Sequence, residues 1–306
     1  MLDVTTFNDR VQIGRHFSVT FERTLRIPDD GREYPLPPSL GHFPVRRVAD
    51  YADRVPPAWR EHGGVFLPMY QREAMWLNFS GAHWRPHALK VALGKVNALS
   101  GKPYHQCLAA GEQDYVVAPP QPWLDGINAG DGFIKQFVAM PLGQGYTVEG
   151  QLTGEETHGG LQLVVFDPKP GRFPDQAPHV ASLRARGSGA MAPACAPAGA
   201  VAAEMGLAAG GRMRQQLYPD PHGLDTWDEA NFGRVYVHIA NSEAWTRITG
   251  EPLPPTPVDV RAYLAAGLPW FDLYDDHLGD IGASGVLAGV KSVDELDAQH
   301  VADGVW

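Results

Sequence analysis

The chain has 306 residues and a formal net charge of −10, with 44% hydrophobic and 20% charged residues. This composition excludes wholesale disorder, and the acidic balance argues against nucleic acid or an anionic membrane surface as a partner, because both attract basic proteins. The 34 glycines and 27 prolines indicate short elements joined by many turns.

Two cysteines, Cys107 and Cys195, do not make a disulfide framework. Residues 1–16 show neither the basic nor the apolar region of a signal peptide. No stretch approaches the ~20 apolar residues that span a bilayer. These features predict a soluble cytoplasmic protein.

The first third of the chain favours strands. Residues 11–27 alternate apolar and polar side chains, and the segments 65–79 and 88–99 are rich in residues that suit a sheet. Within 88–99, Gly94 shifts the phase of the alternation, which indicates a β-bulge.

The stretch 121–168 has the clearest strand patterns. Segments 133–140, 147–152 and 161–166 each predict a strand, and a connection with three glycines separates the last two. The links are too short for the helical crossover that parallel strands require, so we expect an antiparallel meander as the core sheet.

The segment 171–211 consists largely of alanine, glycine and proline and has few large apolar residues to bury. We therefore expect a flexible loop or linker there. It divides the chain into a β-rich core region over 1–170 and a region over 212–306. The second region either continues the same domain or forms a smaller α+β unit.

Beyond the linker we expect strands over 212–217 and 234–239, then short helices over 241–248 and 258–266. Ser292 and Glu295 have the spacing of a capping box, which predicts a last helix through about His300. Runs of strands with Gly/Pro turns indicate a mainly β fold (β-rich α+β), an antiparallel two-sheet sandwich-like core with a few short peripheral helices.

Several familiar catalytic and nucleotide motifs are missing from the sequence. There is no Gly-x-Gly-x-x-Gly, no Walker sequence and no Gly-x-Ser-x-Gly elbow. This lowers the odds of a Rossmann dehydrogenase, a P-loop NTPase or an α/β-hydrolase.

Carboxylates and a histidine around the glycine-rich connection suggest acid–base chemistry, because a buried carboxylate near an imidazole can supply a general acid or base. The alternative is an exposed polar hairpin end. An enzyme requires these groups to converge on one pocket. The candidate catalytic residues are Asp125, Glu149, Glu155, His158 and Arg214.

An acidic loop near the C-terminus suggests a metal site. Asp272, Asp275, Asp276 and His277 offer the oxygen ligands that a divalent cation such as calcium prefers. The pattern does not match an EF-hand, and the alternative is a solvated acidic loop. A second metal hypothesis, zinc held by His83 and His87, is weakened by Pro86 between them.

Tryptophan beside a carboxylate occurs at Trp123, Trp227 and Trp270, as in many sugar-binding sites. Each tryptophan has the alternative role of anchoring a loop. Two function classes follow: a protein that binds a small-molecule or protein ligand, or self-assembles, through its loops, and a hydrolase-like enzyme acting on a polar or carbohydrate-like substrate. Exposed edge strands also make a homo-oligomer a reasonable hypothesis.

Overall fold

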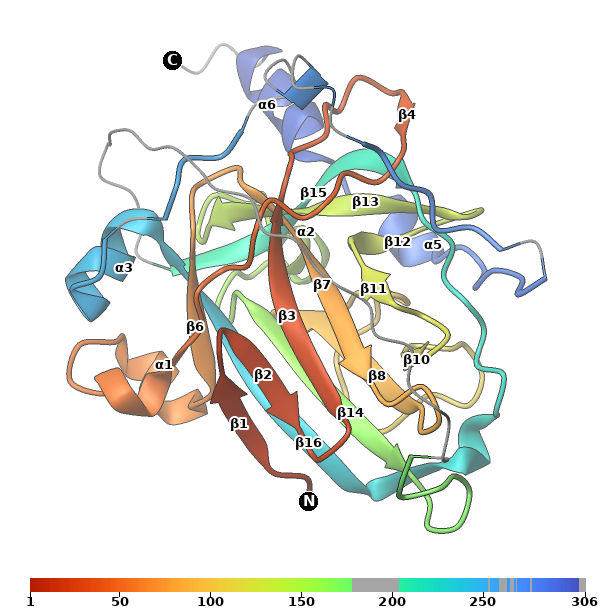
Figure 1. Ribbon diagram of the computed structural model, residues 1–306. Coiled ribbons are helices and arrows are strands. Elements are labelled where there is room, and N and C mark those ends of the chain that lie inside the picture. Colours follow the sequence, from red (N-terminus) through yellow and green to blue (C-terminus); the bar gives the residue numbers. More distant parts are fainter. Residues whose placement is uncertain are drawn as a thin grey trace.

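The computed structural model describes residues 1–177, 204–252, 254–258, 263–264, 267, 269–275 and 277–302. Its strands form a large, mainly antiparallel sheet that folds over on itself, with a few short helices at the periphery (Figure 1). The predicted mainly β, sandwich-like fold is thereby confirmed.

The strands are β1 (Val4–Phe7), β2 (Arg10–Ile13), β3 (Phe17–Thr24), β4 (Glu33–Tyr34), β5 (Arg46–Arg47), β6 (Val65–Met69), β7 (Ala74–Gly81), β8 (His87–Leu93), β9 (Val96–Asn97), β10 (Val116–Ala118), β11 (Trp123–Leu124), β12 (Gly126–Gly130), β13 (Phe133–Pro141), β14 (Leu161–Pro168), β15 (Glu204–Arg214) and β16 (Trp227–Asn241). The helices are η1 (Val48–Tyr51), α1 (Pro57–His62), α2 (Val148–Thr153), η2 (Leu224–Thr226), α3 (Ser242–Thr249), α5 (Gly285–Ala288) and α6 (Val293–Ala302).

The sheet runs in the order β1-β2-β3-β7-β13-β15-β16-β14-β8-β10. The late strands β15 and β16 lie between β13 and β14, so regions 1–170 and 212–306 contribute to the same sheet. The fold therefore depends on pairing between strands that are far apart in the sequence.

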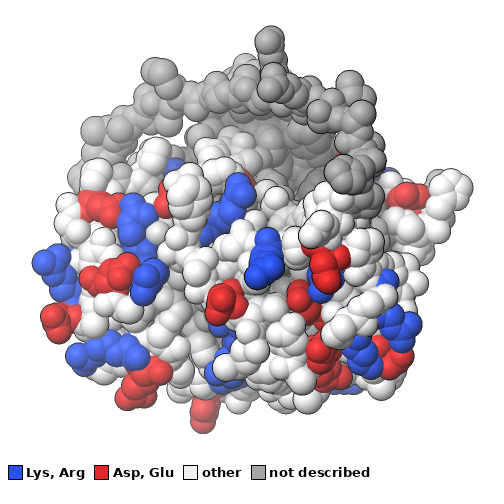
Figure 2. Space-filling model, turned by 60° about the horizontal axis from the view of Figure 1, so that its bottom comes forward, with Lys and Arg blue, Asp and Glu red and all other residues white. Residues whose placement is uncertain are grey.

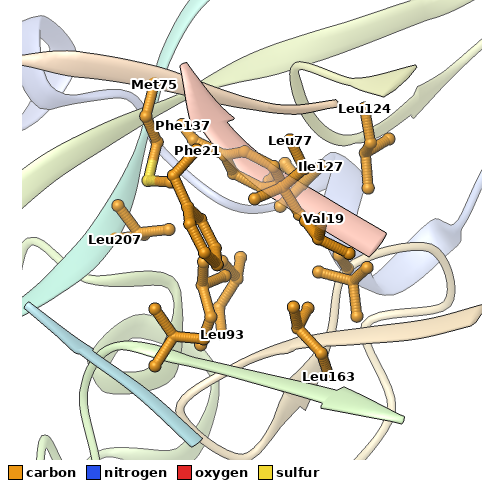
Figure 3. Packing of buried hydrophobic residues seen from close by; sticks show 14 of the residues in the cluster. Val19, Phe21, Met75, Leu77, Leu93, Leu124, Ile127, Phe137, Leu163 and Leu207 are labelled. Atoms are coloured by element: carbon orange, nitrogen blue, oxygen red, sulfur yellow. The ribbon is translucent and has the colours of Figure 1, made fainter. Parts of the chain in front are cut away.

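The hydrophobic core lies between the two halves of this sheet. Figure 3 shows Phe21, Leu77 and Phe137 of β3, β7 and β13 packing towards Leu93 and Leu163 of β8 and β14. Each of these side chains is at most 1% exposed. Burying a side chain of this size contributes about 1.5–3 kcal/mol, so the core is the main source of stability.

The predicted strand 147–152 is wrong: the segment forms helix α2. Thr147 caps the helix, since its hydroxyl accepts a hydrogen bond from the Gly150 N–H at 3.0 Å, and Gly154 ends it with a φ of 78°. Val148 and Leu152 are four residues apart, a spacing that suits one face of a helix as well as one face of a strand.

The predicted meander is also wrong, because β13 and β14 do not pair with each other. β13 pairs with β7, β12 and β15, whereas β14 pairs with β8 and β16. Helix α2 and its connections carry the chain from one half of the sheet to the other.

Gly94 forms a tight turn and not a bulge. Leu93 pairs with Val96, so Gly94 and Lys95 are the two residues of a hairpin loop, and the φ of 55° at Gly94 favours glycine.

The predicted linker 171–211 is wrong for residues 204–211, which belong to β15. Small residues are needed there because the neighbours come close: a Cβ at Gly211 would lie 2.5 Å from the carbonyl oxygen of Pro28. Residues 178–203 lie outside the described part of the chain.

Other predicted elements are present. The strands expected over 11–27, 65–79 and 234–239 form, and α3 occupies the helix predicted over 241–248. In α6, the Ser292 N–H donates to Glu295 Oε2 at 2.7 Å and the Glu295 N–H donates to Ser292 Oγ at 3.2 Å, as in a capping box. The helix predicted over 258–266 falls mostly outside the described residues. Within the described chain, no helix is both long enough and apolar enough to cross a membrane.

Candidate functional site

Loops from five parts of the chain line an open pocket of about 330 Å³, called the loop pocket below. It is lined by His83, Trp84, Pro86, Pro119, Pro120, Phe173, Pro221, His222 and Leu278. None of these side chains carries a permanent charge, and four of them are prolines. The pocket is therefore an apolar hollow with two imidazoles.

The buried side chain of Gln121 holds two walls of the loop pocket together. Gln121, which directly follows Pro120, is fully buried, and its amide donates to the carbonyl oxygen of Gln216 at 3.2 Å. The side-chain oxygen of Gln121 accepts from the Tyr218 N–H at 3.0 Å. These bonds fix the proline loop after β10 against the segment that leads to Pro221.

Aromatic rings form the rest of the wall. The His83 and Trp84 rings meet edge to face at 4.9 Å, and the Phe173 and His222 rings do so at 5.1 Å. The indole N–H of Trp84 is buried and has no hydrogen-bond partner in the described chain. The walls thus offer ring faces and edges to a bound molecule.

A charged cluster lies next to the loop pocket and fixes the β7–β8 connection that carries Trp84. Arg85 contacts Asp175 at 2.7 Å and Asp167 at 3.5 Å, and His87 Nε2 lies 3.0 Å from Asp167 Oδ1. Burial favours a raised pKa for Asp167, but the close contact with His87 and the charge of Arg85 outweigh it and lower that pKa. His87 therefore contacts a carboxylate, whereas His83 lines the pocket.

Two predicted acid–base residues, Glu149 and His158, are brought together. Glu149 Oε1 lies 2.8 Å from His158 Nδ1, and Glu149 Oε2 accepts from the Gly159 N–H at 2.9 Å. The Glu149 side chain is 4% exposed and the His158 side chain 31% exposed. A buried carboxylate therefore orients an imidazole that solvent can reach.

The other predicted catalytic residues lie elsewhere. Asp125 is buried and accepts a hydrogen bond from the Gln215 side chain at 2.7 Å, and burial raises the pKa of Asp125 to about 8. Arg214 lies over the Tyr274 ring, and Glu155 is exposed. Among the described residues, no hydrogen bond or ion pair connects these three side chains to Glu149 or His158.

The predicted acidic metal site is only partly described. Asp272 is exposed, Asp275 Oδ1 accepts from the His277 N–H at 2.9 Å, and Asp276 lies outside the described residues. The part of the chain that is described contains no group of three or more His, Cys, Asp or Glu residues placed to hold a metal ion. The calcium site stays a prediction.

Sequence reasoning missed a group of stacked rings that begins at His62, next to His158. The His62 ring lies 6.2 Å from the His158 ring and stacks on Tyr236 at 4.7 Å. His238, also on β16, stacks on Trp59, and burial lowers its pKa to about 4. The alternation of Arg234, Tyr236 and His238 along one strand was the available signal, because alternate residues share a face.

A further carboxylate–imidazole pair was also missed. Glu22, which is 1% exposed, lies 2.7 Å from His42 Nδ1 and accepts from the hydroxyl of Thr20 at 2.6 Å. Such a pair is thus not unique to Glu149 and His158 in this protein.

Comparison of the chain with protein-family models, with curated proteins and with solved structures yields no match.

Proposed function

We propose that the protein binds a small, neutral, ring-containing molecule in the loop pocket. The observation that carries this proposal is an uncharged pocket wall of prolines and aromatic rings, built entirely by loops on a rigid sheet. Its volume of about 330 Å³ lies at the small end of the range for ligand sites, roughly 300–1,000 Å³.

The chemistry of the wall favours this class of ligand. Flat apolar molecules gain from contact with the faces of Trp84, Phe173 and the proline rings. A charged molecule would lose its hydration without meeting an opposite charge on the wall. The imidazoles of His83 and His222 can each exchange one hydrogen bond with a ligand, which would orient it.

Indole is a suitable neutral probe, and benzoate is its charged counterpart. We expect indole to bind more tightly than benzoate, and Trp84→Ala to weaken indole binding about two- to tenfold, since an aromatic contact contributes about 0.5–1.5 kcal/mol. Ligand-observed NMR titration measures both affinities. Trp270→Ala is the matched control, because Trp270 is also half-buried but packs against Tyr263 outside the pocket. Equal indole affinity in the two variants would contradict the proposal.

A second candidate function is hydrolase-like acid–base chemistry on a polar or carbohydrate-like substrate. The contact between Glu149 and His158 Nδ1 favours it, because a carboxylate on one ring nitrogen leaves Nε2 to accept a proton. On a panel of aryl esters and aryl glycosides, we expect any hydrolysis to fall at least a hundredfold in His158→Gln. His42→Gln is the control variant, and an equal loss in both would count against this candidate.

The predicted homo-oligomer and cytoplasmic location remain proposals. The first is supported by β1, which ends the strand order and leaves Phe7 71% exposed.

A further inference from the structure

Tyr236 on β16 is surrounded by cationic and titratable side chains from separate parts of the chain. Lys95 Nζ, in the β8–β9 turn, lies 5.9 Å from the centre of the Tyr236 ring, and Arg234 Cζ lies 5.7 Å from the same centre. The His62 ring, at the end of α1, stacks on it at 4.7 Å. Lys95, Arg234, His62, Tyr236 and Tyr104 are called the Tyr236 cluster below.

The two permanent cations of the cluster lack a carboxylate partner. Within the described chain, neither Lys95 nor Arg234 forms an ion pair, whereas the buried cations Arg23 and Lys90 each do. Over the described part of the face in Figure 2, Lys and Arg side chains are interspersed with Asp and Glu. Two cations without an ion-pair partner in the described chain thus lie against one ring, that of Tyr236.

Tyr104 adds a hydrogen-bond donor without an acceptor. Lys95 Nζ lies 5.9 Å from the centre of the Tyr104 ring, and the Tyr104 hydroxyl is buried with no hydrogen-bond partner among the described residues. Burial raises the pKa of Tyr104 to about 12, although the charge of Arg234 acts in the opposite direction. The hydroxyl therefore keeps its proton at neutral pH and can act as a hydrogen-bond donor but not as an anion.

The buried carboxylate beside Gly94, that of Glu149, forms no ion pair with Lys95 or Arg234 in the described chain. Glu149 is already bonded to His158 and to the Gly159 N–H. Burial and the charges of His158 and Lys95 lower the pKa of His62, against a smaller opposite effect of Glu61. The charges of Lys95 and Arg234 thus act on His62 in the same direction as burial.

We propose that the Tyr236 cluster binds the oxyanion of a small molecule, a phosphoryl or carboxylate group, between Lys95, Arg234 and His62. Lysine supplies a mobile point charge and arginine a planar fork of donors that matches an oxyanion. The site is separate from the loop pocket. It adjoins the Glu149–His158 pair but does not require that pair to transfer a proton.

Binding of inorganic phosphate and of acetate tests the proposal, with chloride at equal ionic strength to separate specific binding from screening. Calorimetric titration of the full-length protein measures each affinity. We expect Lys95→Met and Arg234→Gln each to weaken binding at least tenfold, since each keeps most of the apolar stem and removes the charge. Lys169→Met, which removes a cation paired with Asp225, is the matched control and is expected to bind as the unaltered protein does.

A stronger response to phosphate identifies a phosphoryl ligand, and a stronger response to acetate a carboxylate. The ring-proton NMR signals of His62, assigned with His62→Gln, should shift on binding in the unaltered protein. No binding beyond the chloride baseline would overturn the proposal, and so would equal affinity in Lys95→Met, Arg234→Gln and Lys169→Met. These readouts measure binding alone, so they are independent of indole affinity and of hydrolysis.

Discussion

Replacing Lys90 by methionine is expected to lower the free energy of unfolding by about 3–5 kcal/mol. Lys90 is fully buried on β8, and its ammonium donates to Asp114 Oδ2 and to the carbonyl oxygen of Cys107, both at 2.6 Å. Methionine fills a similar volume but removes the charge. The buried carboxylate of Asp114 would then keep only the exposed His105 imidazole, whose Nε2 lies 3.7 Å from Oδ2, as an ion-pair partner in the described chain, and this poorly compensated charge accounts for most of the cost.

Urea unfolding monitored by circular dichroism measures this change. Adding Asp114→Asn to Lys90→Met should recover part of the loss, because the double variant buries no charge at this position. Lys169→Met is the control: its partner Asp225 is exposed, and an exposed pair contributes about 0–1 kcal/mol. A loss in Lys90→Met no larger than in this control would show that the buried pair does not stabilise the fold.

The Lys90–Asp114 pair also positions Tyr104 of the Tyr236 cluster. Asp114 lies near the end of the loop between β9 and β10, and its backbone oxygen accepts a hydrogen bond from the Asn97 side chain at 2.7 Å. Tyr104 lies in that loop, and its ring centre is 6.0 Å from Lys90 Nζ. The Lys90–Asp114 pair therefore holds against the sheet the segment that supplies the unpartnered hydroxyl of the Tyr236 cluster.

The sequence predicted the strands whose patterns are strongest. In β3, β14 and β16 the apolar residues are too frequent for a loop, and their β-branched and aromatic side chains suit a sheet. The sequence could not predict how the strands pair. Chain order suggested that β13 and β14 belong to one meander, but β13 pairs with β15 and β14 with β16, which come some 50 residues or more later. No local pattern encodes that choice.

The candidate sites show the same limit. Glu149 and His158 were predictable because a short helix and its following turn bring residues nine apart together. The wall of the loop pocket was not, since Trp84, Phe173 and His222 come from distant loops and belong to no catalytic motif. Likewise, Lys95 and Arg234 meet at Tyr236 only through the pairing of β8, β14 and β16.

Asp125→Asn is expected to remove a large loss of stability that the unaltered protein suffers as the pH rises from about 4 to about 8. In the folded protein burial raises the pKa of Asp125 to about 8, whereas an unfolded aspartate titrates near 3.9. The folded state therefore keeps a proton that the unfolded state releases as the pH rises above about 4. The stabilising effect of that proton is complete below pH 4. It then falls by about 1.4 kcal/mol per pH unit until the folded carboxyl ionises.

Asparagine resembles the protonated acid and cannot ionise. Its side-chain oxygen can accept the Gln215 hydrogen bond that Asp125 Oδ2 accepts at 2.7 Å, so the packing is retained. Between pH 6 and pH 8 we therefore expect the unaltered protein to lose about 2–3 kcal/mol relative to Asp125→Asn. Urea unfolding of both proteins at the two pH values measures the difference, in which titration of the histidines cancels. A difference that does not change with pH would mean that Asp125 is already ionised at pH 6. In that case the charge would need a compensating cation, and none contacts Asp125 among the described residues.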